Sequence, residues 1–150
     1  MDLILWRHAE AEESRPDMAR KLTARGQKHA ARMAEWLHQR LPSKFTVLAS
    51  PAERTRQTAL ALGTAFKTVE ALAPGASVAS ILAAAEWPDR KGAVIVVGHQ
   101  PDLGRVAASL ISGSDNGWTL KKGGLWWITN RVKNDDAQVV VRAVMAPDLL

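Results

Sequence analysis

The sequence predicts a single α/β domain over residues 1–150, a three-layer sandwich with a mainly parallel central sheet and helices on both faces. Three observations carry this prediction. Short continuous apolar runs, typical of strands buried on both faces, alternate with segments of helical periodicity. No linker rich in proline, glycine or serine divides the 150 residues, a length that fits one domain. The last two apolar runs are joined by a short polar segment, which indicates an antiparallel pair at the C-terminal edge of the sheet.

The first part of the chain predicts a strand, a loop and a helix. Residues 3–6 form an apolar run that is too short for a signal peptide and predicts a buried strand. The polar residues 9–21, with Pro16 in the middle, predict a loop. Thr23 can cap the helix that follows, and Pro42 can end it. The apolar face of that helix comprises Ala30, Met33, Ala34, Leu37 and Leu41.

Residues 45–49 predict a second buried strand, and the helix after it has complete start signals. Pro51 would occupy the first helical position, while Ser50 and Glu53 would form a capping box. We expect this helix to run to about Phe66.

The second half of the chain continues the alternation. A third helix is predicted over residues 77–87, and a fourth, which opens on a proline, over residues 101–111. Between them, the run AVIVV at residues 93–97 predicts the clearest strand in the chain. The antiparallel edge pair is predicted over residues 125–130 and 138–145, with an Asn-Asp-Asp segment at the connection.

Composition and charge exclude several classes of site. The chain has no cysteine, which excludes disulfides, thiolate catalysis, iron–sulfur clusters and cysteine-based zinc sites. No apolar run approaches the ~18 residues of a membrane span, so we expect a cytoplasmic protein with no membrane partner. The net charge of +5 suits an anionic partner, but does not distinguish nucleic acid, acidic lipid and phosphorylated substrates.

Polar side chains follow three of the predicted strands, at the edge where open α/β sheets bind ligands. Arg7 and His8 follow the first strand, Arg54 lies in the segment after the second, and His99 follows the AVIVV strand. Arginine matches phosphate oxygens with paired planar donors. A neutral imidazole is a competent nucleophile, and a second, protonated one can stabilise added negative charge. The four residues predict a phosphoryl-transfer site that works through histidine, with no metal and no cofactor.

These segments resemble the histidine phosphatase superfamily, whose fold is phosphoglycerate mutase-like, and within it the SixA-type phosphohistidine phosphatases. The matching motifs are LWRHAEA at residues 5–11, DMARKLT at 17–23, SPAERTRQTA at 50–59, EALAPG at 70–75 and VGHQP at 97–101. They occur in the family's order and span residues 3 to about 104. An Arg-His pair alone would be weak evidence, but the pair with the S-P-x-x-R segment and the later Gly-His is specific.

The resemblance implies a role for each matching residue. His8 would be the nucleophile that takes the phosphoryl group, and water would then hydrolyse the phosphohistidine enzyme. Arg7, Arg54 and His99 would bind the equatorial phosphoryl oxygens and stabilise the charge in transfer. Arg20 could reach the site from the loop, or it could be a solvated loop charge.

The general acid is the position at which the motifs depart most from the family. Gln100 stands where histidine acid phosphatases place an aspartate after the second histidine, and Asp102 lies further on, inside the predicted helix. Phosphoglycerate mutase-like members supply a glutamate from the middle of the chain. Glu70 is the one loosely comparable candidate here, and its other interpretation is an exposed carboxylate before a turn. Ala9 replaces a glycine found in many members, a change that SixA-like members tolerate.

An uncommitted acid favours a phosphoramidate substrate. Expelling an alkoxide from a phosphomonoester requires a proton donor. Imidazole is a far weaker base, so its departure depends less on a proton donor. Only the loop over residues 9–21 is available as a cover, and a shallow site suits phosphohistidine displayed on another protein. We therefore expect a phosphatase that removes phosphate from histidine-phosphorylated signalling or carrier proteins through phosphohistidine on His8.

Two alternatives remain open from the sequence. A small-molecule phosphomonoesterase of the same superfamily would use the same histidine but needs a proton donor. A non-catalytic phosphate- or nucleic-acid-binding module would account for the net charge, but the basic residues are scattered and form no stripe, so we expect no nucleic-acid partner. The oligomeric state is undecided, with a monomer favoured.

Overall fold

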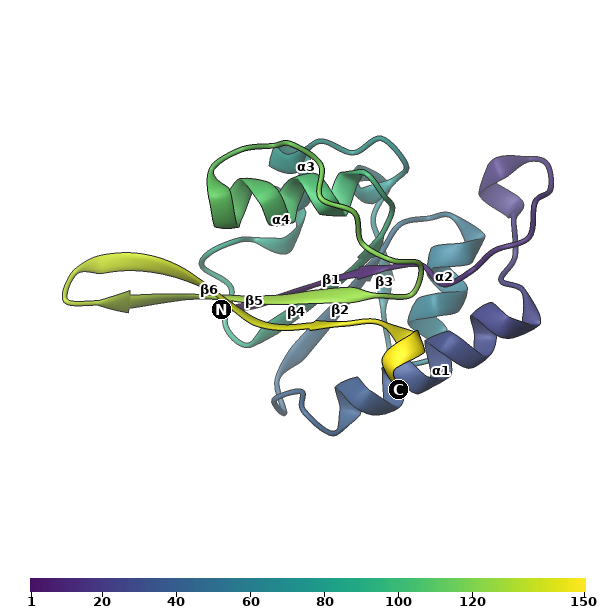
Figure 1. Ribbon diagram of the computed structural model, residues 1–150, viewed down its shortest axis with the longest axis horizontal. Coiled ribbons are helices and arrows are strands. Elements are labelled where there is room, and N and C mark those ends of the chain that lie inside the picture. The colour runs from purple at the N-terminus through teal and green to yellow at the C-terminus, as the bar shows by residue number, and fades with distance from the viewer.

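The computed structural model describes residues 1–150, which form one six-stranded sheet between two layers of helices (Figure 1). The strand order is β3-β2-β4-β1-β5-β6. Strand β1 (Asp2–Arg7) pairs in parallel with β4 (Ala93–Gly98), and β4 pairs in parallel with β2 (Phe45–Ala49). Beyond β2 lies the two-residue strand β3 (Lys67–Thr68), also parallel. The predicted α/β sandwich with a mainly parallel sheet is confirmed.

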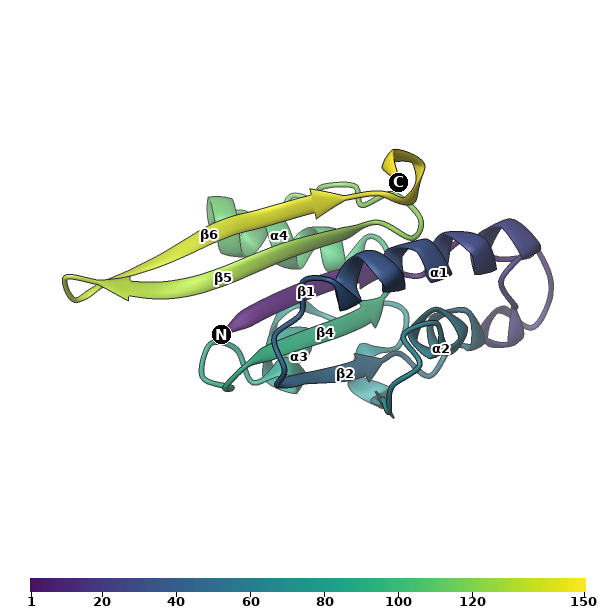
Figure 2. The ribbon, with the colours of Figure 1, turned by 90° about the horizontal axis from the view of Figure 1, so that it is seen from below.

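The two C-terminal strands form an antiparallel pair at the edge of the sheet, as predicted. Strand β5 (Leu125–Lys133) pairs with β1, and β6 (Asp136–Met145) pairs with β5 and forms the outer edge. The two strands are joined by Asn134 and Asp135, which both have positive φ, a conformation that these residue types tolerate in hairpin turns. Figure 2 shows this hairpin extending past the start of β1.

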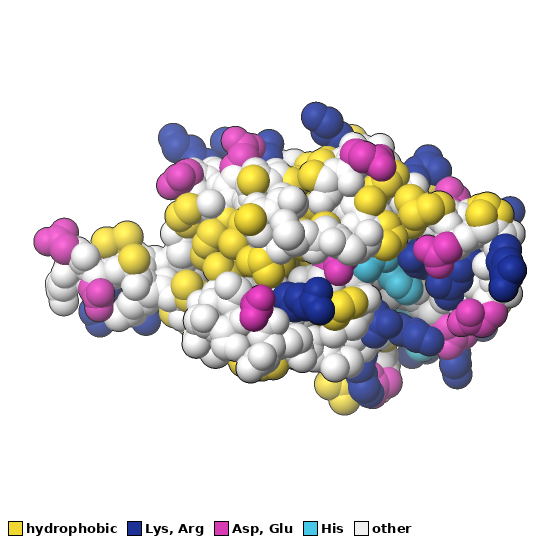
Figure 3. Space-filling view, turned by 90° about the horizontal axis from the view of Figure 1, so that it is seen from above, with side chains coloured by type: hydrophobic (Ala, Val, Ile, Leu, Met, Phe, Trp, Pro, Cys, Tyr) yellow, Lys and Arg dark blue, Asp and Glu magenta, His cyan; other side chains and the backbone are white.

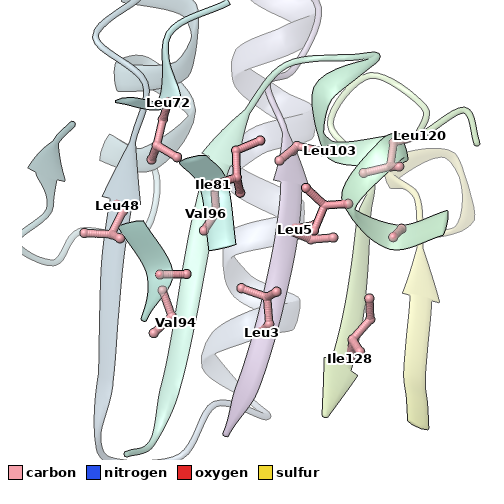
Figure 4. Packing of buried hydrophobic residues seen from close by; sticks show 13 residues of the cluster. Leu3, Leu5, Leu48, Leu72, Ile81, Val94, Val96, Leu103, Leu120 and Ile128 are labelled. Carbon is pink, nitrogen blue, oxygen red and sulfur yellow. The ribbon is translucent and has the colours of Figure 1, made fainter. Parts of the chain in front are cut away.

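Two helices cover each face of the sheet (Figures 1 and 2). Helices α1 (Ala24–His38) and α2 (Glu53–Leu60) lie on one face, and α3 (Val78–Ala85) and α4 (Asp102–Ser112) lie on the other. A cluster of 13 buried hydrophobic residues fills each space between sheet and helices, and alternate residues of β1 enter each cluster. Figure 4 shows the cluster beneath α3 and α4, to which the sheet contributes Leu3, Leu5, Leu48, Val94, Val96 and Ile128.

Three short 3-10 helices complete the fold: η1 (Asp17–Ala19), η2 (Glu70–Leu72) and η3 (Pro147–Leu149). The first lies within the predicted loop, which an isolated bridge between Ala11 and Leu22 closes at its base. No helix is both long enough and apolar enough to cross a membrane.

The start of α2 corrects the predicted capping box. Helix α2 begins at Glu53 with Ala52 in the N-cap position, and no side chain caps it. The hydroxyl of Ser50 instead accepts a hydrogen bond from the Ala52 N–H and contacts His99. The helix starts later than predicted because the polar group that the capping box required is used by the neighbouring strand end.

The ends of the first two helices also differ from the prediction. Thr23 caps α1 as expected, with its hydroxyl accepting from the Gly26 N–H, but α1 ends at His38 rather than near Leu41. Helix α2 ends at Leu60 rather than Phe66 because the chain beyond it must extend to form β3. A two-residue strand leaves too short a pattern to be recognised from sequence.

Candidate active site

A cleft of about 520 Å³ lies at the carboxyl ends of β1, β2 and β4, the edge at which the sequence predicted the site. No Leu, Ile, Val, Met, Phe or Trp side chain lines it. Its cationic side chains are Arg7, Arg20, Arg54, Arg105 and Lys122. Glu13 and Asp102 are its carboxylates. Figure 3 shows histidine atoms in a hollow with Lys and Arg side chains beside them. The cleft is therefore polar and has an excess of positive charge.

His8 is held directly after β1 by its main chain and by one ring nitrogen. Its N–H donates to the Gly98 carbonyl, and its carbonyl accepts from the Gly123 N–H. The ring is buried, and Nδ1 lies 2.8 Å from the Ala9 carbonyl oxygen. A carbonyl can only accept, so Nδ1 carries the proton and donates it. The neutral ring therefore keeps an unshared electron pair on Nε2.

The surroundings keep His8 neutral near pH 7. Burial lowers the pKa of His8 from 6.5 to about 4, and the positive charges of Arg54, Arg7 and Arg20 act in the same direction. The hydrogen bond to the Ala9 carbonyl opposes this shift but does not cancel it. The Nε2 electron pair is consequently available without a neighbouring base to remove a proton.

His99 follows β4 and lies beside His8, with ring centroids 5.5 Å apart. Its Nε2 is 2.7 Å from the hydroxyl oxygen of Ser50, while its buried Nδ1 has no partner. Burial lowers the pKa of His99 to about 3, and the charge of Arg54 adds to the effect. The Ser50 hydroxyl also accepts from the Ala52 N–H, and when it donates its own proton to Nε2, the proton of the His99 ring is on Nδ1.

Two arginines approach the histidines from different elements. Arg7 is the last residue of β1, and its Nη1 donates to the Leu120 carbonyl at 2.7 Å. Arg54 is in the first turn of α2 and is 4% exposed. The Nε atoms of both arginines are buried without a hydrogen-bond partner. Since an unpaired buried donor is costly, these groups are suited to an anion that completes their hydrogen bonds.

The loop after β1 brings a third arginine to the cleft, together with an aspartate that contacts Arg54. Arg54 donates to the Asp17 carbonyl through Nη1 at 2.9 Å, and to the Asp17 carboxylate through Nη2 at 3.1 Å. Arg20 donates to the same carboxylate and to the Glu12 carbonyl. Arg20 also forms an ion pair with Glu13 at 3.5 Å. Arg20 thus lines the cleft, as one of its two predicted roles required, and Asp17 joins it to Arg54.

The carboxyl group proposed from the sequence as a general acid is not in the cleft. Glu70 is the first residue of η2 and does not line the cleft. Gln100 lines the cleft, and its side-chain amide donates to the Trp118 carbonyl at 2.8 Å. Asp102 does line the cleft; it is 3% exposed and accepts from the Gly75 N–H at 2.9 Å. Burial raises the pKa of Asp102, although the main-chain donors around it lower the pKa in part.

Three residues that position the site were not identified from the sequence. Ser50 contacts His99, and Asp17 holds Arg54. Thr58 accepts from the Ala9 N–H through its hydroxyl, which it donates in turn to the Arg54 carbonyl. Each is polar and lies inside a motif, but only the folded chain shows which partner it contacts. No three His, Asp or Glu side chains are grouped so that they could hold a metal ion.

Comparison with known proteins places this geometry in a family. The model of the histidine phosphatase superfamily (branch 1) matches residues 3–73. An uncharacterised protein of Picosynechococcus sp. is 35% identical over 138 residues, covering 83% of this chain and 82% of that protein. The chain belongs to the histidine phosphatase superfamily. It is accordingly a phosphatase, and the cleft that contains His8 and His99 is its candidate active site.

Solved structures of the superfamily match the whole fold. A SixA protein from Nakamurella multipartitia, named as a candidate phosphohistidine phosphatase, has a TM-score of 0.80 at 27% identity, covering 97% of this chain and 95% of that one. The protein histidine phosphatase SixA in complex with tungstate has a TM-score of 0.79 at 24% identity, covering 99% of both chains. At 24% identity, the comparison with the tungstate complex shows that the two proteins share a fold. The predicted phosphoglycerate mutase-like architecture is confirmed.

Proposed function

We propose that this histidine phosphatase removes the phosphoryl group from phosphohistidine on a protein, through a phosphohistidine intermediate on His8. The observation that carries the proposal is the hydrogen bond from His8 Nδ1 to the Ala9 carbonyl, which leaves Nε2 as the nucleophilic atom. This atom belongs to a buried, neutral ring beside the cationic side chains of the cleft.

The first step transfers the phosphoryl group to His8. The electron pair of Nε2 attacks phosphorus, and the bond from phosphorus to the substrate's imidazole nitrogen breaks. That nitrogen keeps the bonding electrons and takes a proton from solvent. Arg7 and Arg54 would bind the equatorial oxygens through donors that have no partner in the free enzyme, and His99 would donate from Nδ1.

The second step regenerates the enzyme. Water attacks phosphorus on the side opposite His8, the bond from phosphorus to Nε2 breaks, and the electrons return to the ring. Phosphate leaves, and the proton of the attacking water passes to phosphate or solvent. The hydrogen bond from Nδ1 to Ala9 keeps Nδ1 protonated throughout, so His8 returns to its starting tautomer.

The side chains of the cleft favour a protein-bound phosphoramidate over a sugar phosphate as the substrate. Of its two carboxyl groups, Glu13 is 93% exposed and ion-paired with Arg20, and Asp102 is engaged with the main chain at Gly75. Neither is a committed proton donor, and imidazole can leave without one to a degree that an alkoxide cannot. The lining has no Leu, Ile, Val, Met, Phe or Trp side chain that could form a pocket for a hydrophobic leaving group.

The test is hydrolysis of phosphohistidine on a small carrier protein, measured beside a panel of phosphomonoesters with EDTA present. We expect phosphohistidine to be turned over at least about 100-fold faster than the esters. His8→Ala should abolish turnover, and His29→Ala provides a matched control because His29 lies on α1 and does not line the cleft. Ester hydrolysis that exceeds phosphohistidine hydrolysis would refute the proposal, as would loss of activity in EDTA.

A second candidate is a small-molecule phosphomonoesterase, and one observation favours it. Asp102 combines a position in the cleft with a pKa raised by burial, the combination expected of a proton donor to an alkoxide leaving group. Its main-chain hydrogen bonds favour the ionised form, which argues against this role. The same substrate panel separates the two functions.

A further inference from the structure

We infer that two copies of this chain associate through their β6 strands, which pair antiparallel and join the two sheets into one. Strand β6 is ten residues long and no other strand covers its outer side. It carries only two charged residues, Asp136 and Arg142. Long edge strands with few charges are templates for pairing with another chain, and they are usually blocked by lysine, proline or a covering element. The opposite edge, β3, has only two residues to offer.

Main-chain groups in the middle of β6 point toward its free edge. Val139 lies opposite Asn130 of β5, and the Asn130 N–H donates to the Met1 carbonyl on the other side of β5. Asn130 and Val139 are therefore a non-hydrogen-bonded pair, in which the N–H and C=O of each residue point away from the other strand. Because this pattern alternates, Ala137 and Val141 also direct their N–H and C=O groups outward.

One antiparallel register pairs all of these outward groups. When Val139 lies opposite Val139 of the second copy, Ala137 of each copy lies opposite Val141 of the other, and every outward donor meets an acceptor. The same register sets Asp136 opposite Arg142, the residue that the β5–β6 bulge leaves without a partner in β5, at both ends of the interface. Moving the register by two residues in either direction places one outward residue opposite the bulge or the turn, and separates the two charges. The two charges of β6 thus select the register that the backbone requires.

The side chains match in this register as well. Within one copy, Val132 lies opposite Ala137, and Ile128 lies opposite Val141. Across the interface, Val132 and Ala137 of one copy would continue into Val141 and Ile128 of the other, an apolar row across four strands. Val132 is 71% exposed and Val141 is 39% exposed in the single chain. Pairing would shield this apolar surface from water.

The hairpin has a structural need for such a partner. Strand β1 pairs with β5 no further than Thr129, so residues 131–138 project as a ribbon of two strands (Figure 2). A two-stranded ribbon is only marginally stable in water, whereas a sheet of three or more strands with a hydrophobic face can be stable by itself. Pairing with a second copy converts the ribbon to four strands. Because both copies use the same strand, the assembly closes at two.

The first test is the mass of the full-length protein in solution as a function of concentration, by sedimentation equilibrium. We expect a species of twice the 16.3 kDa chain mass that dissociates on dilution. A single species of 16.3 kDa up to about 1 mM would overturn the inference, as would assemblies that grow beyond two copies.

Charge reversal tests the register. Asp136→Arg should raise the dissociation constant about tenfold, because two pairs of like charges then face each other across the interface. Arg142→Asp should have a similar effect, and the double variant should return to within about threefold of the original protein. A double variant that remains as weak as either single variant would overturn this register. Arg142 also contacts Asp2 and Trp127, so the thermal midpoint is measured for each variant.

A proline tests the main-chain pairing. Val139→Pro removes a donor that faces the free edge and takes no part in the β5–β6 ladder, a position at which edge strands accept proline. We expect a monomer with an unchanged circular dichroism spectrum and unchanged phosphatase turnover, since the cleft lies at the other end of the sheet. Dimerisation at the original affinity in this variant would overturn the inference.

Discussion

The hydroxyl oxygen of Ser50 lies 2.7 Å from Nε2 of His99, and both side chains are buried. They come from the ends of two adjacent parallel strands, 49 residues apart in the chain. This contact occupies one ring nitrogen of His99 and leaves Nδ1 without a hydrogen-bond partner. We therefore expect Ser50 to act as a positioning residue for His99.

Ser50→Ala should lower kcat by about tenfold, because the His99 ring loses the hydrogen bond that sets its tautomer and orientation. KM should change less, since Arg7 and Arg54 still bind the phosphoryl group. Steady-state kinetics with phosphohistidine measure both constants. Ser112→Ala is the matched control, because its hydroxyl bonds to the Ala108 carbonyl within α4, away from the cleft. Equal kinetics for the Ser50 variant and the original protein would exclude the positioning role.

The two histidines should make folding stability depend on pH. Above pH 6.5 they are neutral in both the folded and the unfolded chain, and they contribute no pH dependence. As pH falls below 6.5, both histidines become protonated in the unfolded chain. In the folded chain they stay neutral until the pH approaches their lowered pKa values, about 4 for His8 and about 3 for His99. The free energy of unfolding should therefore fall across this range, and urea titrations at several pH values would measure it.

Replacement of His8 by Asn should make that pH dependence shallower between pH 6.5 and 4. For the original protein, kcat/KM should stay level from about pH 5 to pH 8, because His8 remains neutral there. A His8 titration near pH 6.5, followed by NMR, would contradict both expectations.

The two candidate acids should respond differently to amide replacement. Asp102→Asn should reduce ester hydrolysis at least about tenfold but leave phosphohistidine turnover within about threefold, because imidazole leaves without a committed proton donor. Glu70→Gln should change neither, since Glu70 does not line the cleft. The measurement is kcat/KM on both substrates. A tenfold loss with phosphohistidine in the Asp102 variant would make Asp102 the acid of the main reaction.

Gly104 should be sensitive to the smallest substitution. A Cβ atom there would lie 1.7 Å from the Trp118 carbonyl oxygen, the same atom that accepts from Gln100. Gly104→Ala must separate α4 from residue 118 and should cost about 3 kcal/mol, measured as the change in free energy of unfolding. Gly117→Ala is the control: its Cβ would make only ordinary contacts, so its effect should stay within about 0.5 kcal/mol.

The sequence predicted the elements whose information is local. Strand β4 is a run of six buried residues, and the apolar face of α1 repeats with helical period, so both were recognised from pattern. The capping box at Ser50 was wrong because a local signal competed with a long-range contact to His99. Strand β3 was missed because two exposed residues carry no periodicity.

For the candidate site, the sequence by itself predicted which side chains come together and that they follow parallel strands. Arg7, His8, Arg54 and His99 meet because strand order brings those ends to one edge. Only the tertiary structure decided which nitrogen of His8 is free, how far its pKa falls, and that Glu70 stays outside the cleft. Residue types and their order are properties of the chain, whereas burial, tautomer and hydrogen-bond partners depend on atoms that folding brings together from distant segments.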